Sequence, residues 1–172
     1  DKDNKTFYRG RYDKYHVLDT CSWGVQVLAM VEYMNPELFE YGLNGELYLK
    51  SIDIYALLDY AENHFSTTVE YNGNIYTNLY TAAEEDGNPV MFEWTLQMAV
   101  SYLIAANKSE IEGNFLKAEE YRQKAQNIIK DVQDYSRDLN FDYPPYIDQN
   151  GRKIYQKNGW IAYQVEFVAG LA

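Results

Sequence analysis

Residues 90–106 read VMFEWTLQMAVSYLIAA and contain a single charged side chain, that of Glu93. Apolar residues occupy every side of a helix with this sequence, which is typical of a helix surrounded by protein. The stretch 19–33 has the same character, and it begins with Asp19-Thr20, a pair typical of a helix N-cap. The sequence therefore predicts two buried helices, over 19–33 and 90–106.

Two further helices are predicted to be amphipathic. In the stretches 46–65 and 112–139, apolar residues recur at helical spacing and polar residues fill the other positions. Because the connection from 19–33 to 46–65 is short, we expect these two helices to pack antiparallel. Between 46–65 and 90–106, β-branched and aromatic residues flank Asn72-Gly73, which predicts a small two-stranded hairpin.

The other segments show no complete element. Residues 1–17 are polar and rich in tyrosine, so we expect an extended arm there, and the runs 84–89 and 140–158 are predicted to be loops. From residue 159 the sequence GWIAYQVEFVAGLA predicts the beginning of a fifth, mostly apolar helix. We expect one domain over 1–172, which is either a processed or trimmed chain or a fragment of a longer protein.

The three tryptophans suggest a repeat. Trp23, Trp94 and Trp160 are 71 and 66 residues apart, and the sequences that follow them can be aligned, with Gln26 matching Gln97. A repeat of about 70 residues, with one helical hairpin in each unit, accounts for this spacing. Repeated hairpins form either an open solenoid or a closed α/α toroid. The alternative is that the three tryptophans are unrelated core residues.

The composition excludes several classes of partner. The chain has 15 lysines and arginines against 26 aspartates and glutamates, a net charge of −11, so neither nucleic acid nor an anionic membrane is expected to bind. The longest nearly apolar run, around Trp23–Met30, is far shorter than the ~20 residues that cross a bilayer. The chain also has 18 tyrosines, a composition that, combined with the many acidic residues, favours carbohydrate as the ligand. The apolar faces of sugars stack on aromatic rings.

Metal, cofactor and cysteine chemistry are not predicted. The only soft ligands, His16, Cys21 and His64, lack the spacing of a zinc site, and a single cysteine excludes an internal disulfide. Neither of the common glycine-rich phosphate-binding patterns occurs in the sequence. We therefore expect no cofactor and no metal.

Three stretches, LDTCSWGVQVLA (18–29), LLDYAENHF (57–65) and FEWTLQMAVSYLIAA (92–106), resemble helices of the α/α-toroid, six-hairpin glycosidase-like proteins. Asp19 with Trp23-Gly24 matches an Asp-x-x-x-Trp-Gly pattern near one inner helix start. Glu93 begins a second pattern, Glu-[small]-Thr-x-Gln-Met-Ala, which continues with Thr95, Gln97, Met98 and Ala99 and in which Trp94 replaces the small residue.

The resemblance implies an all-α fold of helical-hairpin repeats, a toroid or partial toroid with one small β-hairpin insertion. A full toroid has six hairpins, and this chain contains fewer than three. The chain is then either the C-terminal part of a larger toroid or a fragment whose inner helices are covered by a partner.

The resemblance also directs attention to two carboxylates. Glycoside hydrolysis uses a pair of carboxyl groups, one of them with a raised pKa, and Asp19 and Glu93 are the best candidates. Each of them is in the first turn of a helix, and in stacked hairpins these two helices would run parallel. Both carboxyl groups would therefore lie at the same end of the toroid, around its opening. There the helix dipole favours the ionised forms, which suits a base better than a proton donor. The alternative is structural: Asp19 as an N-cap and Glu93 as an ordinary first-turn acid.

Further residues complete the expected site. Aromatic rings are predicted to stack on sugar and side-chain amides to form hydrogen bonds, although packing in the core is the alternative for the tryptophans. The candidate substrate-binding residues are Trp23, Trp94, Gln97, Tyr143, Tyr146 and Trp160.

Two functions therefore remain open. The first is a carbohydrate-active, glycoside hydrolase-like protein that acts on or binds oligosaccharide or polysaccharide. The second is a helical-repeat module without catalysis that binds a protein or peptide partner, including another copy of the chain.

Overall fold

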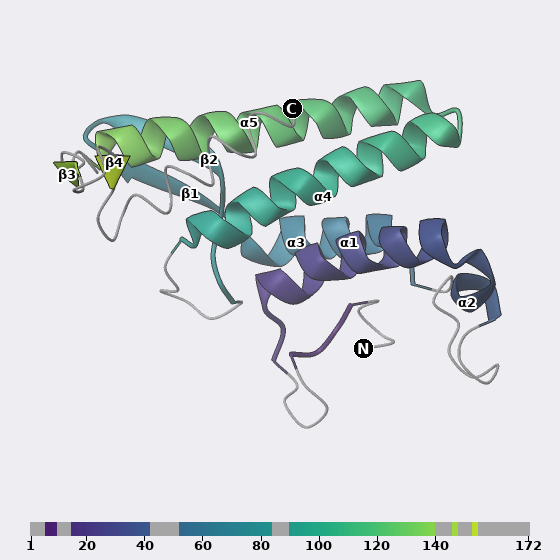
Figure 1. Cartoon of the computed structure of the whole chain (residues 1–172). Helices are drawn as coiled ribbons and strands as arrows, with labels where there is room; N and C mark the ends of the chain where they lie inside the picture. The colour runs from purple at the N-terminus through teal and green to yellow at the C-terminus, as the bar shows by residue number, and fades with distance from the viewer. Residues whose placement is uncertain are drawn as a thin grey trace.

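A computed structural model describes residues 6–9, 15–41, 52–83 and 90–139, and the backbone pairing of 146–147 with 153–154. The elements are α1 (Leu18–Met34), α2 (Pro36–Tyr41), α3 (Ile54–Phe65), β1 (Ser66–Tyr71), β2 (Asn74–Tyr80), α4 (Phe92–Ile111), α5 (Phe115–Asp138), β3 (Tyr146–Ile147) and β4 (Lys153–Ile154) (Figure 1).

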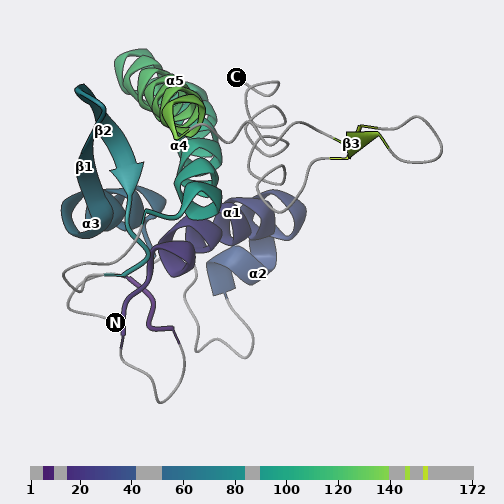
Figure 2. The same ribbon diagram turned by 90° about the vertical axis from the view of Figure 1, so that its left-hand side faces the viewer.

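The long helices form two helical hairpins. α3 returns antiparallel to α1 and α5 returns antiparallel to α4, while α1 and α4 pack side by side and run in the same direction (Figure 1). The predicted helices over 19–33, 90–106 and 112–139 are confirmed, and so is the antiparallel packing of the second helix on the first. Figure 2 views the bundle nearly end-on, with the β1–β2 hairpin on the side away from α2.

Helix α3 begins later than the sequence predicted. Ile52 and Asp53 are not helical, and the Asp53 side chain accepts a hydrogen bond of 2.9 Å from the backbone N–H of Tyr55. Asp53 is therefore the N-cap that fixes the start of α3 at Ile54. The predicted helical residues before Ile52 lie outside the described residues.

The short helix α2 was not predicted, although its signal is present. Asn35 accepts a hydrogen bond of 3.0 Å from the backbone N–H of Leu38, and Pro36 occupies the first helical position. Asparagine as the cap with proline directly after it is a favoured way to begin a helix. The pair Asn35-Pro36 therefore ends α1 and begins α2.

The predicted β-hairpin is confirmed at Asn72-Gly73. Both turn residues have positive φ, 51° and 81°, as a two-residue turn of type I′ requires. The strands pair antiparallel from Tyr71 opposite Asn74 to Ser66 opposite Tyr80, with an irregularity between Thr67 and Val69.

The predicted fold class, an all-α toroid or partial toroid with the hairpin as an insertion, is wrong. Strand β2 contributes Tyr76, Leu79 and Tyr80 to the same buried cluster as the helices, and it packs on α5 and α4. The sheet is thus part of the core, and the protein mixes helices with an antiparallel sheet. The physical reason is mutual burial: β2 packs on α5, so its apolar side chains and the apolar side of α5 are removed from water together.

The N-terminal arm lies against α1 at its one glycine. A Cβ atom on Gly24 would lie 2.7 Å from Cε2 of Phe7 and 3.1 Å from Cδ1 of Leu57, so only glycine allows this close approach. Beside it, the hydroxyl of Thr6 and the thiol of Cys21 form a buried contact of 3.4 Å. The arm therefore covers part of the α1–α3 hairpin.

Candidate functional site

Polar side chains join α1 to α4. Ser22 Oγ donates to Gln97 Oε1 at 3.1 Å, and Ser101 Oγ lies 3.0 Å from the backbone oxygen of Ser22. Gln26 Nε2 donates to the backbone oxygen of Gln97 and to Ser101 Oγ, each at 3.4 Å. Gln26 and Gln97, which match when the sequences after Trp23 and Trp94 are aligned, therefore contact each other along the line where α1 and α4 meet, which we call the seam.

The far end of the seam is held by an ion pair. Lys108 Nζ lies 2.8 Å from both carboxylate oxygens of Glu32. The hydrogen bond to Glu32 and the charges of Glu32 and Glu112 raise the pKa of Lys108, against the opposing effect of burial, which is the largest single influence. The relative placement of α1 and α4 is thus fixed at both ends.

Asp19 lies in the first turn of α1, one residue beyond the helix start. The N-cap is Val17, which offers no side-chain cap, so the interpretation of Asp19 as the cap is wrong. Atom Oδ1 of Asp19 is buried and has no hydrogen-bond partner within the described part of the chain. Burial raises the pKa of Asp19, and the backbone of Thr20 and the charge of Arg9 offset only part of this effect.

This pKa direction reverses the expectation drawn from the helix dipole. A dipole at a helix N-terminus favours the carboxylate, whereas burial favours the neutral acid. At Asp19 burial is the largest influence on the pKa, ahead of the backbone of Thr20 and the charge of Arg9. The environment of Asp19 therefore favours the neutral acid more than that of an ordinary aspartate.

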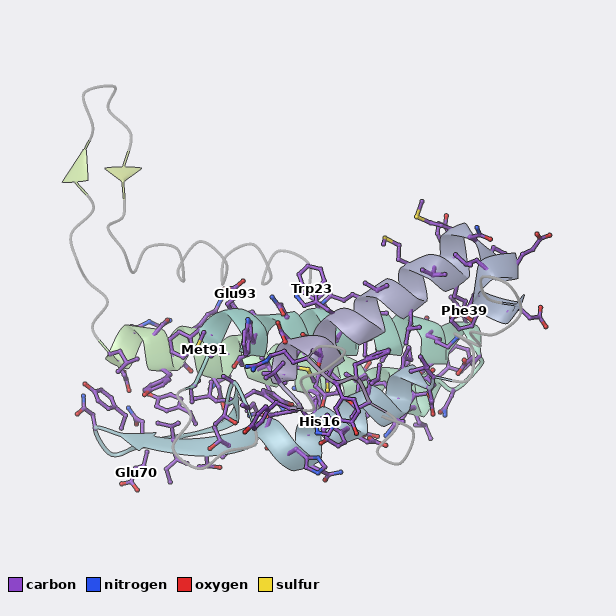
Figure 3. The ribbon with its side chains drawn as sticks, turned by 90° about the horizontal axis from the view of Figure 1, so that it is seen from below. His16, Trp23, Phe39, Glu70, Met91 and Glu93 are labelled. Carbon is purple, nitrogen blue, oxygen red and sulfur yellow. The ribbon has the colours of Figure 1, made fainter. Side chains whose placement is uncertain are left out.

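Glu93 and Trp23 lie on one side of the α1/α4 pair. Glu93 is exposed in the first turn of α4, and the Trp23 ring on α1 is 52% exposed. Figure 3 shows both on the same side, with Glu70 and His16 on the opposite side. Asp19 precedes Trp23 by four residues, one helical turn, so its side chain is on the same face of α1.

The other predicted site residues either contact neighbouring parts of the protein or lie outside the described side chains. Trp94 is half-buried and packs against the core, which fits the packing alternative, and Gln97 is occupied at the seam. For Tyr146 only the backbone pairing in β3 is described. Tyr143 and Trp160 lie outside the described residues.

Sequence reasoning missed a tyrosine–carboxylate cluster in which two buried tyrosines meet the partly exposed Glu62 at the edge of the core. Oε2 of Glu62 accepts hydrogen bonds from Tyr80 at 2.7 Å and from Tyr102 at 2.5 Å, and Lys124 Nζ lies 3.7 Å away. Burial raises the pKa values of both tyrosines well above their usual range, and the charge of Glu62 adds to this. Because these tyrosines stay protonated as donors, the cluster ties α3, β2 and α4 together.

A polar hollow of about 290 Å³ lies between β2 and α5. Asp131 in its wall accepts hydrogen bonds from the backbone N–H groups of Thr77 and Asn78, at 2.9 and 3.0 Å. Asp138 accepts from Asn74 and from Tyr76. These carboxylates are therefore engaged in holding the hairpin on α5.

Among the residues the structure describes, no three histidine, cysteine, aspartate or glutamate side chains are grouped to hold a metal ion. No described helix is both long enough and apolar enough to span a membrane.

Comparisons with known protein families, with curated proteins and with solved structures found no match. The resemblance to glycosidase-like proteins therefore depends on the quoted residues alone.

Proposed function

We propose that the end of the α1/α4 pair that carries Asp19 and Glu93 is a carbohydrate site with glycoside hydrolase-like chemistry. The observation that carries the proposal is the contrast between the two carboxyl groups. Asp19 is partly buried with a raised pKa, and Glu93 is exposed at the start of the neighbouring parallel helix. Two carboxyl groups in unlike environments are what acid–base catalysis at a glycosidic bond requires.

Each carboxyl group has a role that follows from its surroundings. Asp19, which holds its proton to higher pH than an ordinary aspartate, donates that proton to the leaving oxygen. Glu93 faces solvent, where it activates a water molecule or stabilises the positively charged sugar ring as the bond breaks.

Trp23 supplies the binding surface. Its ring is 52% exposed one turn after Asp19, and an exposed indole is suited to stack on the apolar face of a sugar. The Trp23 ring therefore places a glycosidic bond near the first turns of α1 and α4.

Binding is tested first by the melting temperature of the full chain with a panel of neutral oligosaccharides and oligouronates. A ligand that binds only the folded state raises this temperature. We expect one class of glycan to raise it and Trp23→Ala to abolish the rise. Tyr33→Ala, at an aromatic residue that is 90% exposed near the other end of α1, is the matched control and should keep the rise.

Turnover of the glycan so identified tests the chemistry. Asp19→Asn and Glu93→Gln should each reduce the rate by about 100-fold or more, the usual contribution of a positioned acid or base. Glu70→Gln, on the opposite side of the molecule in Figure 3, should leave the rate unchanged. Binding without turnover in the unmodified chain would reduce the proposal to a carbohydrate-binding site, and a flat panel would reject it.

A protein-binding module is the second candidate. It is favoured by exposed apolar side chains on α1, which include Val27, Met30 and Met34. Such a module predicts that Asp19→Asn and Glu93→Gln leave binding of the partner intact. A protein partner that binds the chain in the absence of any glycan, and that binds both variants as well as the unmodified chain, would support this second candidate.

A further inference from the structure

Three tyrosine rings from three helices stack in a row. The rings of Tyr55 on α3 and Tyr121 on α5 are nearly parallel, with an angle of 5° between them and centroids 5.9 Å apart. The Tyr121 ring also stacks on the ring of Tyr102 on α4, at 5.7 Å and 30°. These separations are typical of aromatic rings in contact. We call Tyr55, Tyr121 and Tyr102 the tyrosine stack.

The phenol groups at both ends of the tyrosine stack donate hydrogen bonds to carboxylates. Tyr55 donates to Glu112 Oε2 at 2.8 Å, and Tyr102 donates to Glu62 Oε2 at 2.5 Å. Tyr80, whose hydroxyl lies 3.3 Å from that of Tyr102, donates to the same oxygen of Glu62. Because a base takes a proton only within hydrogen-bond reach, each carboxylate is placed to accept the proton of its phenol.

The two ends of the tyrosine stack differ in exposure. Tyr55 is half-buried, and the side chain of its acceptor Glu112 is 46% exposed. Tyr121 and Tyr102 are 3% and 1% exposed. The tyrosine stack therefore leads from solvent at Tyr55 into the core at Tyr102, and a solute too large to enter the core meets the Tyr55 end first.

The surroundings of Tyr102 suit the loss of an electron together with a proton. In the resting protein, burial and the charge of Glu62 raise the pKa of Tyr102, so the phenol keeps its proton. Removal of an electron makes a phenol strongly acidic, and Glu62 is in place to accept the proton. Lys124 Nζ lies 5.3 Å from the centroid of the Tyr102 ring, which disfavours positive charge on that ring. Oxidised Tyr102 is therefore stable as the neutral radical, after its proton has moved to Glu62.

We propose that the tyrosine stack conducts one-electron oxidation from solvent to Tyr102, which holds the resulting radical. The reaction partner is a strong one-electron oxidant in solution that reacts at the Tyr55 end. Neither Asp19 nor Glu93 belongs to the tyrosine stack, so this activity is independent of the proposed carbohydrate function.

Electrons and protons balance at each step. The oxidant takes one electron from Tyr55 and is reduced, while the phenol proton of Tyr55 moves to Glu112. An electron then passes from Tyr102 through Tyr121 to Tyr55, and the proton returns from Glu112 to Tyr55. At the same time the phenol proton of Tyr102 moves to Glu62. The products are the reduced oxidant, a neutral Tyr102 radical and a neutral Glu62 acid.

Photo-oxidation of the full chain with a radical trap in the core tests the proposal. The trap is 3-aminotyrosine in place of Tyr102, which is oxidised more easily than tyrosine and gives a radical with its own electron paramagnetic resonance spectrum. The oxidant is tris(bipyridine)ruthenium(III), generated by a light flash with persulfate. We expect the aminotyrosyl radical to form, and Tyr121→Phe, which keeps the ring without the phenol, to lower its yield about tenfold.

Tyr33→Phe is the matched control for Tyr121→Phe. Tyr33 is 90% exposed on α1 and lies outside the tyrosine stack, so its loss should leave the yield of the aminotyrosyl radical unchanged. Equal yields in Tyr121→Phe and Tyr33→Phe, or no aminotyrosyl radical in the chain that carries only the trap, would overturn the proposal.

A second pair of variants tests the proton acceptor in the same chain. Glu62→Gln keeps an oxygen that accepts a hydrogen bond but cannot take the proton, so we expect the yield of the radical to fall about tenfold. Glu70→Gln, at an exposed carboxylate on β1, should not change it. Near-ultraviolet circular dichroism verifies that the core packing of each variant is unchanged. Equal yields in these two variants would remove Glu62 as the proton acceptor and contradict the proposal.

Discussion

Helices α1 and α4 have similar sequences and different surroundings. Both are poor in charge and both have apolar residues on every side. In α4, ten of 20 residues are buried, under α5, α1 and β2; in α1, five of 17 are buried, under α3 and α4. The remaining side of α1 presents Trp23, Val27, Met30 and Met34 to solvent within the described part of the chain.

The difference shows what an apolar sequence pattern can establish. The pattern indicates that a helix needs to pack against protein on several sides, because its exposed apolar area is unfavourable in water. It does not indicate which element packs there and covers the helix. For α4 part of the cover is local in sequence, since α5 follows after a turn at Gly113, whereas none of the described elements covers the outward side of α1.

The largest effect expected from this comparison is on two methionines. Met98 on α4 is fully buried and Met30 on α1 is 55% exposed. Met98→Ala should lower the free energy of unfolding by about 2–5 kcal/mol, because it removes apolar contacts and leaves a cavity. Met30→Ala should lower it by less than about 1 kcal/mol. Urea denaturation of the two variants measures both values.

Equal costs for the two methionine variants would contradict the comparison. A large cost for Met30→Ala would mean that Met30 packs against protein and is not exposed as the structure shows it. A small cost for Met98→Ala would mean that α4 is not the packed centre of the protein.

A smaller effect is expected on two tyrosines. Tyr102 on α4 is buried and donates a hydrogen bond to Glu62, whereas Tyr33 on α1 is 90% exposed. Tyr102→Phe should cost about 1–3 kcal/mol, since it removes a hydrogen bond to a carboxylate while keeping the ring. Tyr33→Phe should change stability by less than about 0.5 kcal/mol. Thermal denaturation of both variants checks the difference, and a neutral Tyr102→Phe would show that Glu62 finds another donor.

Much of the fold could be predicted from local signals. Periodicity located the long helices, and Asn72-Gly73 located the hairpin. The fold class could not be predicted, because it depends on whether the hairpin stands apart or packs on the helices. That choice is made by contacts far apart in sequence, such as Tyr80 with Glu62 and Asp131 with the backbone of β2.

The sequence could predict that Asp19 and Glu93 lie at the starts of two parallel helices, but not the electrostatic environment of either carboxyl group. Parallel packing of the helices that begin near Asp19 and Glu93 followed from the hairpin order. The raised pKa of Asp19 did not, because the dipole can be inferred from sequence and burial cannot. The error about the N-cap has the same origin: a helix begins where packing allows it, and Val17 is held there by an isolated bridge to Ala83.

The smallest expected effect, on the stability of the fold, concerns Asp19 itself. Its pKa in the folded protein is raised above the ordinary value of 3.8. Between pH 3.8 and the raised pKa of the folded state, the folded protein binds more protons than the unfolded chain. The free energy of unfolding therefore falls as pH rises through this window and stays reduced above it. Asp19→Asn removes this loss and should stabilise the protein at pH 7 relative to pH 3, by less than about 1 kcal/mol because the carboxyl group is only partly buried. Urea denaturation at the two pH values measures the change, with Asp59→Asn on the exposed side of α3 as the control.

If Asp19→Asn were instead destabilising at pH 7, the ionised form of Asp19 would be the one that the folded protein favours. Arg9 would then outweigh burial, and the difference between the environments of Asp19 and Glu93 on which the acid–base roles depend would disappear.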